Sequence, residues 1–165
     1  MNDKYFSVVL TSAAEWENEE AIPILIWRRV LSDFIFTHCN RIGFEPWHLE
    51  PEGFYQQDFF STLNLSDKLS LNHVTDRIDT YALSDEIKQR VLELGISQLP
   101  SSSTYFLSDR KIFAIALSFD CYIFFPALSS QQVRELEPLD DHPEFAFNVE
   151  KKLPERLTEL SHIEN

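Results

Sequence analysis

Three short apolar runs between residues 103 and 125 constrain the fold more than any other feature of this sequence. The runs STYFL, KIFAIALS and CYIFF are rich in β-branched and aromatic residues, and short polar breaks separate them. Such a pattern predicts an antiparallel meander of three strands. The middle run alternates between two apolar sets, Phe113, Ile115 and Leu117 on one face and Ile112, Ala114 and Ala116 on the other. We therefore expect this strand to be central and covered on both sides, with a helix approaching the small residues.

Two segments predict helices that pack on this sheet. Apolar residues recur at steps of three and four from Ile24 to Ile42, and Gly43 is typical of a helix stop. The second helix starts after Ser84, a favourable N-cap residue, and ends at Gly95. We expect three residues of the first helix in the core, namely Trp27, Leu31 and Phe34.

Weaker signals complete the predicted fold. Residues 4–10 and 145–149 have the composition and alternation of strands. Ser12 with Glu15 predicts a helix over 13–21, Ser129 with Gln132 predicts a short helix, and Pro154 fits the first turn of a C-terminal one. Residues 44–66 predict an ordered loop with a helical turn near 55–62, whereas 68–82 remain unassigned. The sequence thus predicts a single α+β domain spanning residues 1–165, with an antiparallel sheet packed against helices.

Composition indicates a folded, acidic protein. The 165 residues are 44% hydrophobic, which separates the chain from disordered sequences despite a net charge of −13. The N-terminus lacks the pattern of a secretory signal, and the longest apolar run, IPILIW, is far shorter than the roughly 20 residues of a membrane span. Two cysteines are too few for a disulfide framework. We expect a cytoplasmic protein with no membrane contact.

The acidic charge lies at the two ends of the chain. Residues 1–67 carry a net charge of −7, residues 68–134 are neutral, and residues 135–165 carry −6. Nucleic-acid backbones and anionic membranes require clustered Lys and Arg, so this pattern argues against both. A basic protein partner is the natural complement, although acidity also serves solubility alone.

No motif in the chain predicts a catalytic or metal centre. With glycine only at positions 43, 53 and 95, the chain has neither a GxGxxG sequence nor a P-loop. His38, Cys39 and His48 lack the spacing of zinc ligands, and we expect no cofactor and no metal. Cys121 could act as a nucleophile, but within a strand a small buried hydrophobic residue is the simpler interpretation.

Two histidine–carboxylate groupings contain the residue types of general acid–base catalysis. His73 with Asp76 is more simply a pair on a helix surface, and Asp140-Asp141-His142 is more simply a solvated turn. A small hydrolase or transferase that uses Cys121 or such a pair remains the enzymatic alternative.

The segment FEPWHLEPEGFYQQDFF, residues 44–60, is the strongest candidate for a binding surface. It holds six aromatic rings and four carboxylates without a Lys or Arg. Large rings supply binding energy at interfaces, and carboxylates pair with basic groups. We expect Phe44, Phe54 and Phe59 to turn inward. The predicted partner-binding residues are Glu45, Trp47, Glu50, Glu52, Tyr55 and Asp58.

Two alternatives stay open for this surface. All six rings could belong to the core, with the acids simply hydrated. The binding face could also lie in the other acidic part of the chain, where the secondary candidates are Glu135, Glu137, Asp140, Asp141 and Glu144.

A small, acidic, aromatic-rich domain without a catalytic motif is similar in general character to bacterial toxin-immunity proteins, including those of contact-dependent growth inhibition systems. The resemblance implies a cytoplasmic protein that binds a cognate toxin domain, often a basic nuclease, and blocks its active site or substrate groove. An acidic regulatory protein or DNA mimic is a further alternative, and the oligomeric state stays open.

Overall fold

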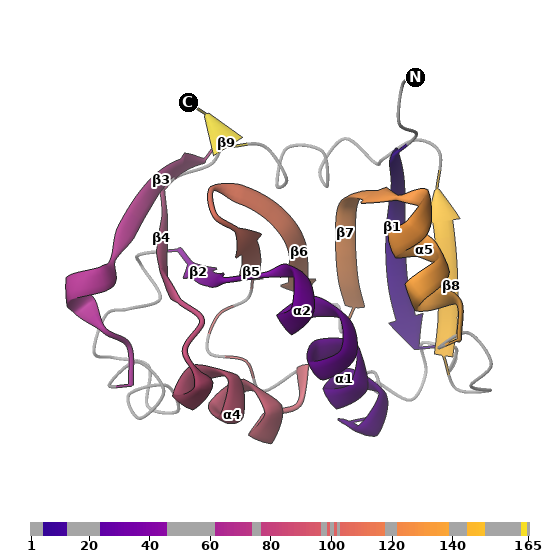
Figure 1. The fold of residues 1–165 in the computed structure, drawn as a ribbon, viewed down its shortest axis with the longest axis horizontal. Coiled ribbons are helices and arrows are strands. Elements are labelled where there is room, and N and C mark those ends of the chain that lie inside the picture. Colours follow the sequence, from indigo (N-terminus) through magenta and orange to yellow (C-terminus); the bar gives the residue numbers. More distant parts are fainter. Residues whose placement is uncertain are drawn as a thin grey trace.

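The computed structural model describes residues 5–12, 24–45, 62–73, 77–96, 99, 101, 103–117, 122–138, 145–150 and 163–164. In this part of the chain, one antiparallel sheet carries short helices on one of its faces (Figure 1). The predicted α+β class is therefore confirmed. No helix within these ranges is long and apolar enough to cross a membrane.

Nine strands of the described residues form the sheet in the order β8-β1-β7-β6-β5-β2-β4-β3-β9, and each neighbouring pair is antiparallel. Their bounds are β1 Tyr5–Ser12, β2 Arg41–Phe44, β3 Leu69–His73, β4 Arg77–Ala82, β5 Ser103–Ser108, β6 Lys111–Leu117, β7 Tyr122–Ser129, β8 Phe145–Glu150 and β9 Ile163–Glu164. The predicted meander is confirmed as β5, β6 and β7, near the centre of the sheet. β3 and β4 occupy the stretch that the sequence pattern left unassigned.

The helix predicted from residue 24 is shorter than expected. α1 (Ile24–Val30), the π-helical turn η2 (Leu31–Ile35) and α2 (Phe36–His38) follow one another, and Cys39 is already extended. Ile42 and Gly43 therefore belong to β2, so the prediction that Gly43 ends the helix is wrong. Glycine is required at position 43, because the Cβ atom of any other residue would lie 2.7 Å from Cγ2 of Ile78 and clash with it. Trp27, Leu31 and Phe34 are buried, as predicted.

The two other helices confirm their cap signals. The Ser84 hydroxyl accepts a hydrogen bond from the Ile87 N–H at the start of α4 (Asp85–Glu93). Ser129 and Gln132 form a reciprocal capping box at α5 (Ser130–Leu136). The predicted strands at 4–10 and 145–149 are confirmed as the paired β1 and β8. The helix predicted over 13–21, the turn near 55–62 and the helix at Pro154 lie outside the described residues.

The middle strand β6 separates two hydrophobic clusters. Ala114 and Ala116 belong to the cluster that contains residues of α1, α4 and α5, so the helices do pack on the small residues. The opposite cluster draws its described members from strands alone. The register shifts at Phe106/Leu107, which turns Phe113 to the helix face and Ile112 away from it. This bulge corrects the simple alternation predicted for the strand.

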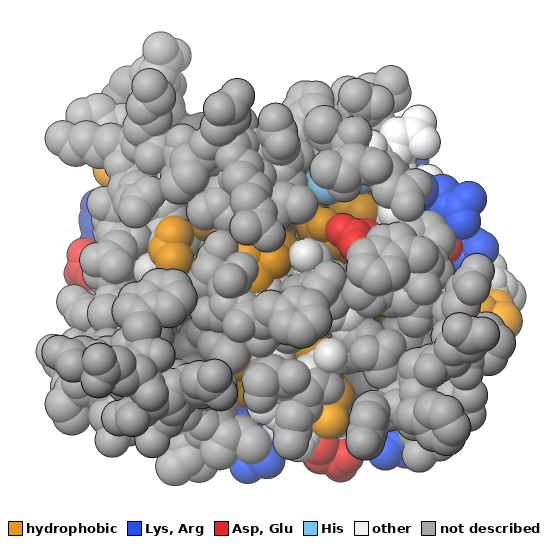
Figure 2. Space-filling view, turned by 180° about the vertical axis from the view of Figure 1, so that it is seen from behind, with side chains coloured by type: hydrophobic (Ala, Val, Ile, Leu, Met, Phe, Trp, Pro, Cys, Tyr) orange, Lys and Arg blue, Asp and Glu red, His pale blue; other side chains and the backbone are white. Residues whose placement is uncertain are grey.

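Figure 2 views the molecule from the side opposite to Figure 1. Hydrophobic side chains of the described residues are visible in this view at several separate places.

Candidate functional site

The predicted binding segment leaves the described fold at Glu45, directly after β2. Phe44 is fully buried, as predicted, and Glu45 is only 9% exposed. Its Oε1 accepts a hydrogen bond of 3.2 Å from the Tyr105 hydroxyl of β5. The prediction that Glu45 offers its carboxylate to a partner is therefore wrong, because this carboxylate is buried against the sheet. Glu45 instead anchors the start of the segment.

Tyr105 is a protonated donor in this contact. Burial raises the pKa of its phenol, and the charge of Glu45 and the hydrogen bond to it raise this pKa further. The ring of His73 packs edge-on against Tyr105, with 5.6 Å between the ring centroids. His73 is buried in β3, so the interpretation of this residue as part of a helix-surface pair is wrong. Asp76 lies outside the described residues.

The chain re-enters the described fold at a short, fixed turn. Leu63 is buried, and the 3-10 turn η4 (Leu65–Asp67) follows it. The Asn64 side-chain oxygen accepts hydrogen bonds from the Ser66 N–H, at 3.1 Å, and the Ser66 hydroxyl, at 2.6 Å. Leu65 is 73% exposed, and among the residues whose side chains the structure describes it is the one large hydrophobic residue that projects freely into solvent. A fixed backbone thus presents an apolar side chain to water.

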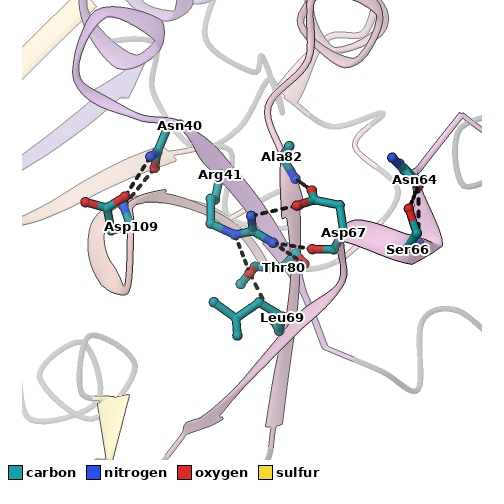
Figure 3. Close-up of polar contacts among 9 residues, drawn as sticks. All are labelled: Asn40, Arg41, Asn64, Ser66, Asp67, Leu69, Thr80, Ala82 and Asp109. Atoms are coloured by element: carbon teal, nitrogen blue, oxygen red, sulfur yellow. Dashed lines mark hydrogen bonds and ion pairs between the residues drawn. The ribbon is translucent and has the colours of Figure 1, made fainter.

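Arg41 holds this turn against the sheet (Figure 3). Its Nη1 donates to Oδ1 of Asp67 at 3.2 Å, and its Nη2 donates to the Asp67 carbonyl at 2.8 Å. The same guanidinium donates to the Thr80 carbonyl and hydroxyl, both at 2.9 Å. Five donors in a planar fork suit such a multiple contact. The Arg41 side chain therefore joins β2, β4 and η4 into one unit.

The second oxygen of Asp67 completes this unit. Oδ2 accepts a hydrogen bond from the Ala82 N–H of β4. This backbone hydrogen bond, followed by the Arg41 guanidinium, holds the pKa of Asp67 below its usual value. Asp67 is consequently a carboxylate at neutral pH, and its charge serves to fix the turn.

We name Asn64–Asp67 together with the Arg41 contacts the clamped turn. Arg41 begins β2 and Glu45 directly follows it. The Tyr105–Glu45 hydrogen bond holds the exit of the predicted binding segment, and the Arg41–Asp67 contact holds its re-entry. Trp47, Glu50, Glu52, Tyr55 and Asp58 lie outside the described residues. The clamped turn was not predictable from the sequence, because Arg41 is 26 residues from Asp67 and 39 residues from Thr80. Only the local Asn64-x-Ser66 pattern could have indicated the turn itself.

The secondary candidate surface is described only in part. Glu135 and Glu137 are exposed at the end of α5, while Asp140, Asp141 and Glu144 lie outside the described residues. Oε2 of Glu135 lies 2.9 Å from Nε2 of His38, at the end of α2. This is a histidine–carboxylate pair that the sequence pattern did not predict.

Most of the net negative charge belongs to residues outside the described part of the chain. The described residues contain twelve acids and ten Lys or Arg residues, a net charge of −2 out of −13. Several of these acids are engaged within the fold, as Asp79 is with Ser70 and Arg77. The described framework is thus close to neutral, and the acidity resides in the segments that join its elements.

The described residues offer little for nucleophilic or metal chemistry. Burial raises the pKa of the Cys39 thiol, which makes it a poor nucleophile and metal ligand. Within the described ranges, no three His, Cys, Asp or Glu side chains gather as metal ligands would. Cys121, His48 and His142 lie outside those ranges.

Comparisons with protein-family models, with curated proteins and with solved structures found no match to this chain. Its function is therefore inferred from its own residues and their arrangement.

Proposed function

We propose that this protein is an immunity protein that binds and neutralises a basic toxin domain, such as a nuclease. The binding surface comprises Leu65 of the clamped turn and the acidic aromatic segment 46–61. One observation carries the proposal: polar contacts to the sheet hold both flanks of this segment, from Tyr105 of β5 to Glu45 at one flank and from Arg41 of β2 to Asp67 at the other.

Such an arrangement suits protein recognition. Loops that carry function are generally mounted on a rigid scaffold, and fixed flanks reduce the entropy lost on binding. Leu65 offers an apolar contact beside a segment that contains Trp47 and Tyr55, and large rings of this kind dominate interface energetics. Carboxylates around them would steer a basic partner to the surface.

The charge distribution supports a basic partner. The near-neutral framework leaves most acids on the connecting segments. Two of these segments, 13–20 with four glutamates and 139–144 with three acids, join the sheet at the paired residues Ser12 and Phe145. These two segments therefore attach negative charge at one place on the framework, in addition to the acids of segment 46–61. The proposal places the protein in the cytoplasm of the producing cell, which suits the free thiol of Cys39.

Co-expression with the product of the neighbouring reading frame tests this function. We expect the protein to rescue the host from toxicity and to copurify with that product. Leu65→Ser should weaken copurification, whereas Gln131→Ser, a change at another exposed position on α5, should not. Absence of both rescue and copurification would contradict the proposal. Equal copurification of the two variants would show that Leu65 does not belong to the binding surface.

One observation favours a catalytic second candidate, a small hydrolase or transferase. The 2.9 Å contact between His38 and Glu135 provides a histidine held by a carboxylate, an arrangement that can serve general base catalysis. A His38→Ala variant that copurifies with the toxin but no longer protects the cell would favour this alternative over simple binding.

A further inference from the structure

A cavity of about 320 Å³ lies beside the end of α2, the β5–β6 hairpin and the start of α5. It is separate from the clamped turn, so a ligand bound there would be independent of the proposed immunity function. Its volume lies at the lower end of the range of small-molecule sites, roughly 300–1,000 Å³. Its described lining combines apolar side chains, among them Ile112 and Phe113, with polar ones, among them Ser129 and Gln132.

Phe113 gives the cavity an aromatic surface that neighbouring rings hold in place. The Phe34 and Phe125 rings contact it with 5.4 and 5.8 Å between ring centroids. The His38 imidazole, which also lines the cavity, stacks on Phe113 at 5.1 Å. This aromatic surface is consequently formed before any ligand arrives, and little side-chain entropy is lost when a flat ring packs on it.

The ionisable side chains of the described lining already have partners. Nε2 of His38 lies 2.9 Å from Oε2 of Glu135. Lys111 is likewise engaged in an interaction within the protein. The described lining contains no Asp or Glu. An ion that enters the cavity would give up water without gaining a free charge of opposite sign, and such a transfer is unfavourable. The cavity therefore favours an uncharged ligand.

The polar side chains of the cavity have donors to spare. In the capping box of α5, Oε1 of Gln132 accepts from the Ser129 N–H at 2.9 Å, and the Ser129 hydroxyl oxygen accepts from the Gln132 N–H at 3.2 Å. The backbone thus uses the acceptor atoms of both side chains. The Gln132 NH₂ group and the Ser129 hydroxyl hydrogen remain for a ligand, and both are donors.

We propose that this cavity binds a small uncharged aromatic carboxamide. Its ring packs on Phe113 and Ile112, and its carbonyl oxygen accepts hydrogen bonds from Gln132 and Ser129. An amide carbonyl has two lone pairs and no net charge, so it can use both donors without a counter-ion. The same two donors would be left without an acceptor by a purely apolar ligand, which disfavours a hydrocarbon.

Titration of the full chain with three probes of nearly equal size tests the site. Benzamide is uncharged, benzoate is an anion and benzamidine is a cation. Each is added up to about 20 mM, and amide chemical shifts are followed. We expect benzamide to shift the signals of Phe113, Ser129 and Gln132 in a saturable way. Both ions should bind at least about tenfold more weakly.

Variants of α5 show whether the Gln132 donor is responsible. Gln132→Glu keeps an oxygen for the capping box but replaces the NH₂ donor with a carboxylate oxygen. Benzamide binding should fall about tenfold, and benzamidine should become the preferred probe, because the carboxylate supplies its counter-charge. Gln131→Glu adds the same charge at the adjacent exposed residue, outside the described lining, and should change neither preference. Melting temperatures show that both variants are folded.

A third variant separates the donors from the neighbouring cation. Lys111→Met removes a charge that the proposed ligand does not use, and benzamide should bind to it as it does to the wild type.

Any of four results would overturn the proposal. The first is an absence of saturable shifts with benzamide, and the second is equal binding of either ion to the wild type. The third is an equal effect of the Gln132 and Gln131 variants, which would show a response to general surface charge. The fourth is a tenfold loss of benzamide binding in Lys111→Met.

Discussion

The carboxylate of Asp67 stabilises the clamped turn. Because its pKa is lowered in the folded protein, the carboxylate stabilises the fold above its usual pKa, and this contribution is lost as the pH falls through the lowered value. We expect Asp67→Asn to cost about 1 kcal/mol of unfolding free energy at neutral pH, since only one of its two acceptor oxygens survives. The difference from the wild type should shrink below about pH 4.

Urea denaturation of both proteins across this pH range measures the effect. Asp33→Asn is the matched control, because Asp33 forms an exposed pair with Arg29 at 3.7 Å and should contribute almost nothing. A difference between Asp67→Asn and the wild type that stays constant down to about pH 3 would contradict the role assigned to the carboxylate.

The hydroxyl group of Tyr105 stabilises Glu45 in its buried position. Tyr105→Phe removes the hydroxyl donor from a carboxylate that is only 9% exposed, and we expect a loss of about 1–3 kcal/mol in unfolding free energy. Glu45→Gln should lose less, because the amide oxygen still accepts from the hydroxyl and no charge is buried. Chemical denaturation checks both variants. An unchanged stability of Tyr105→Phe would show that this contact does not anchor the segment.

Among the elements, the proposed site depends most on β2. Within β2, Gly43 allows the neighbouring strand β4 to pack closely. In Gly43→Ala, the new Cβ would lie 2.7 Å from Cγ2 of Ile78 in β4. We expect a destabilisation of about 1–3 kcal/mol from this overpacking. Combined with Ile78→Ala, the loss should be smaller than the sum of the two single losses, because the second change removes the clashing atom. Strict additivity in thermal or urea unfolding would disprove the clash.

Local patterns predicted the elements well where the cause of the structure is itself local. The meander, the cap of α4 and the capping box of α5 each follow from neighbouring residues, and all three are confirmed. The end of the first helix was mispredicted, because the close approach of Ile78 to Gly43 depends on strand pairing. The turned side chain of Phe113 depends likewise on the register with β5.

Across the whole molecule, the candidate site was only partly predictable. The sequence pattern indicated segment 44–60, but it could not show that Glu45 is buried under Tyr105, 60 residues away. It also gave no sign that Leu65 projects from a turn held by Arg41. Contacts of this kind join residues from distant strands, so they emerge only from the sheet topology.

At the scale of the whole molecule, acidic connecting segments are attached to a near-neutral framework. If the acids steer a basic partner and the apolar groups retain it, charge and apolar contact must affect different rates. A variant with Glu50→Gln, Glu52→Gln and Asp58→Asn tests the charge, and Glu45 is left unchanged because it is buried. Leu65→Ser tests the apolar contact.

The most direct measurement is the rate of association and dissociation between these variants and the product of the neighbouring reading frame, at low and at high salt. We predict that the amide variant associates more slowly, with a deficit that shrinks as salt screens the charges over roughly 8 Å. Leu65→Ser should dissociate faster at both salt concentrations. Wild-type association of the amide variant at low salt, together with wild-type dissociation of Leu65→Ser, would contradict the proposed binding surface.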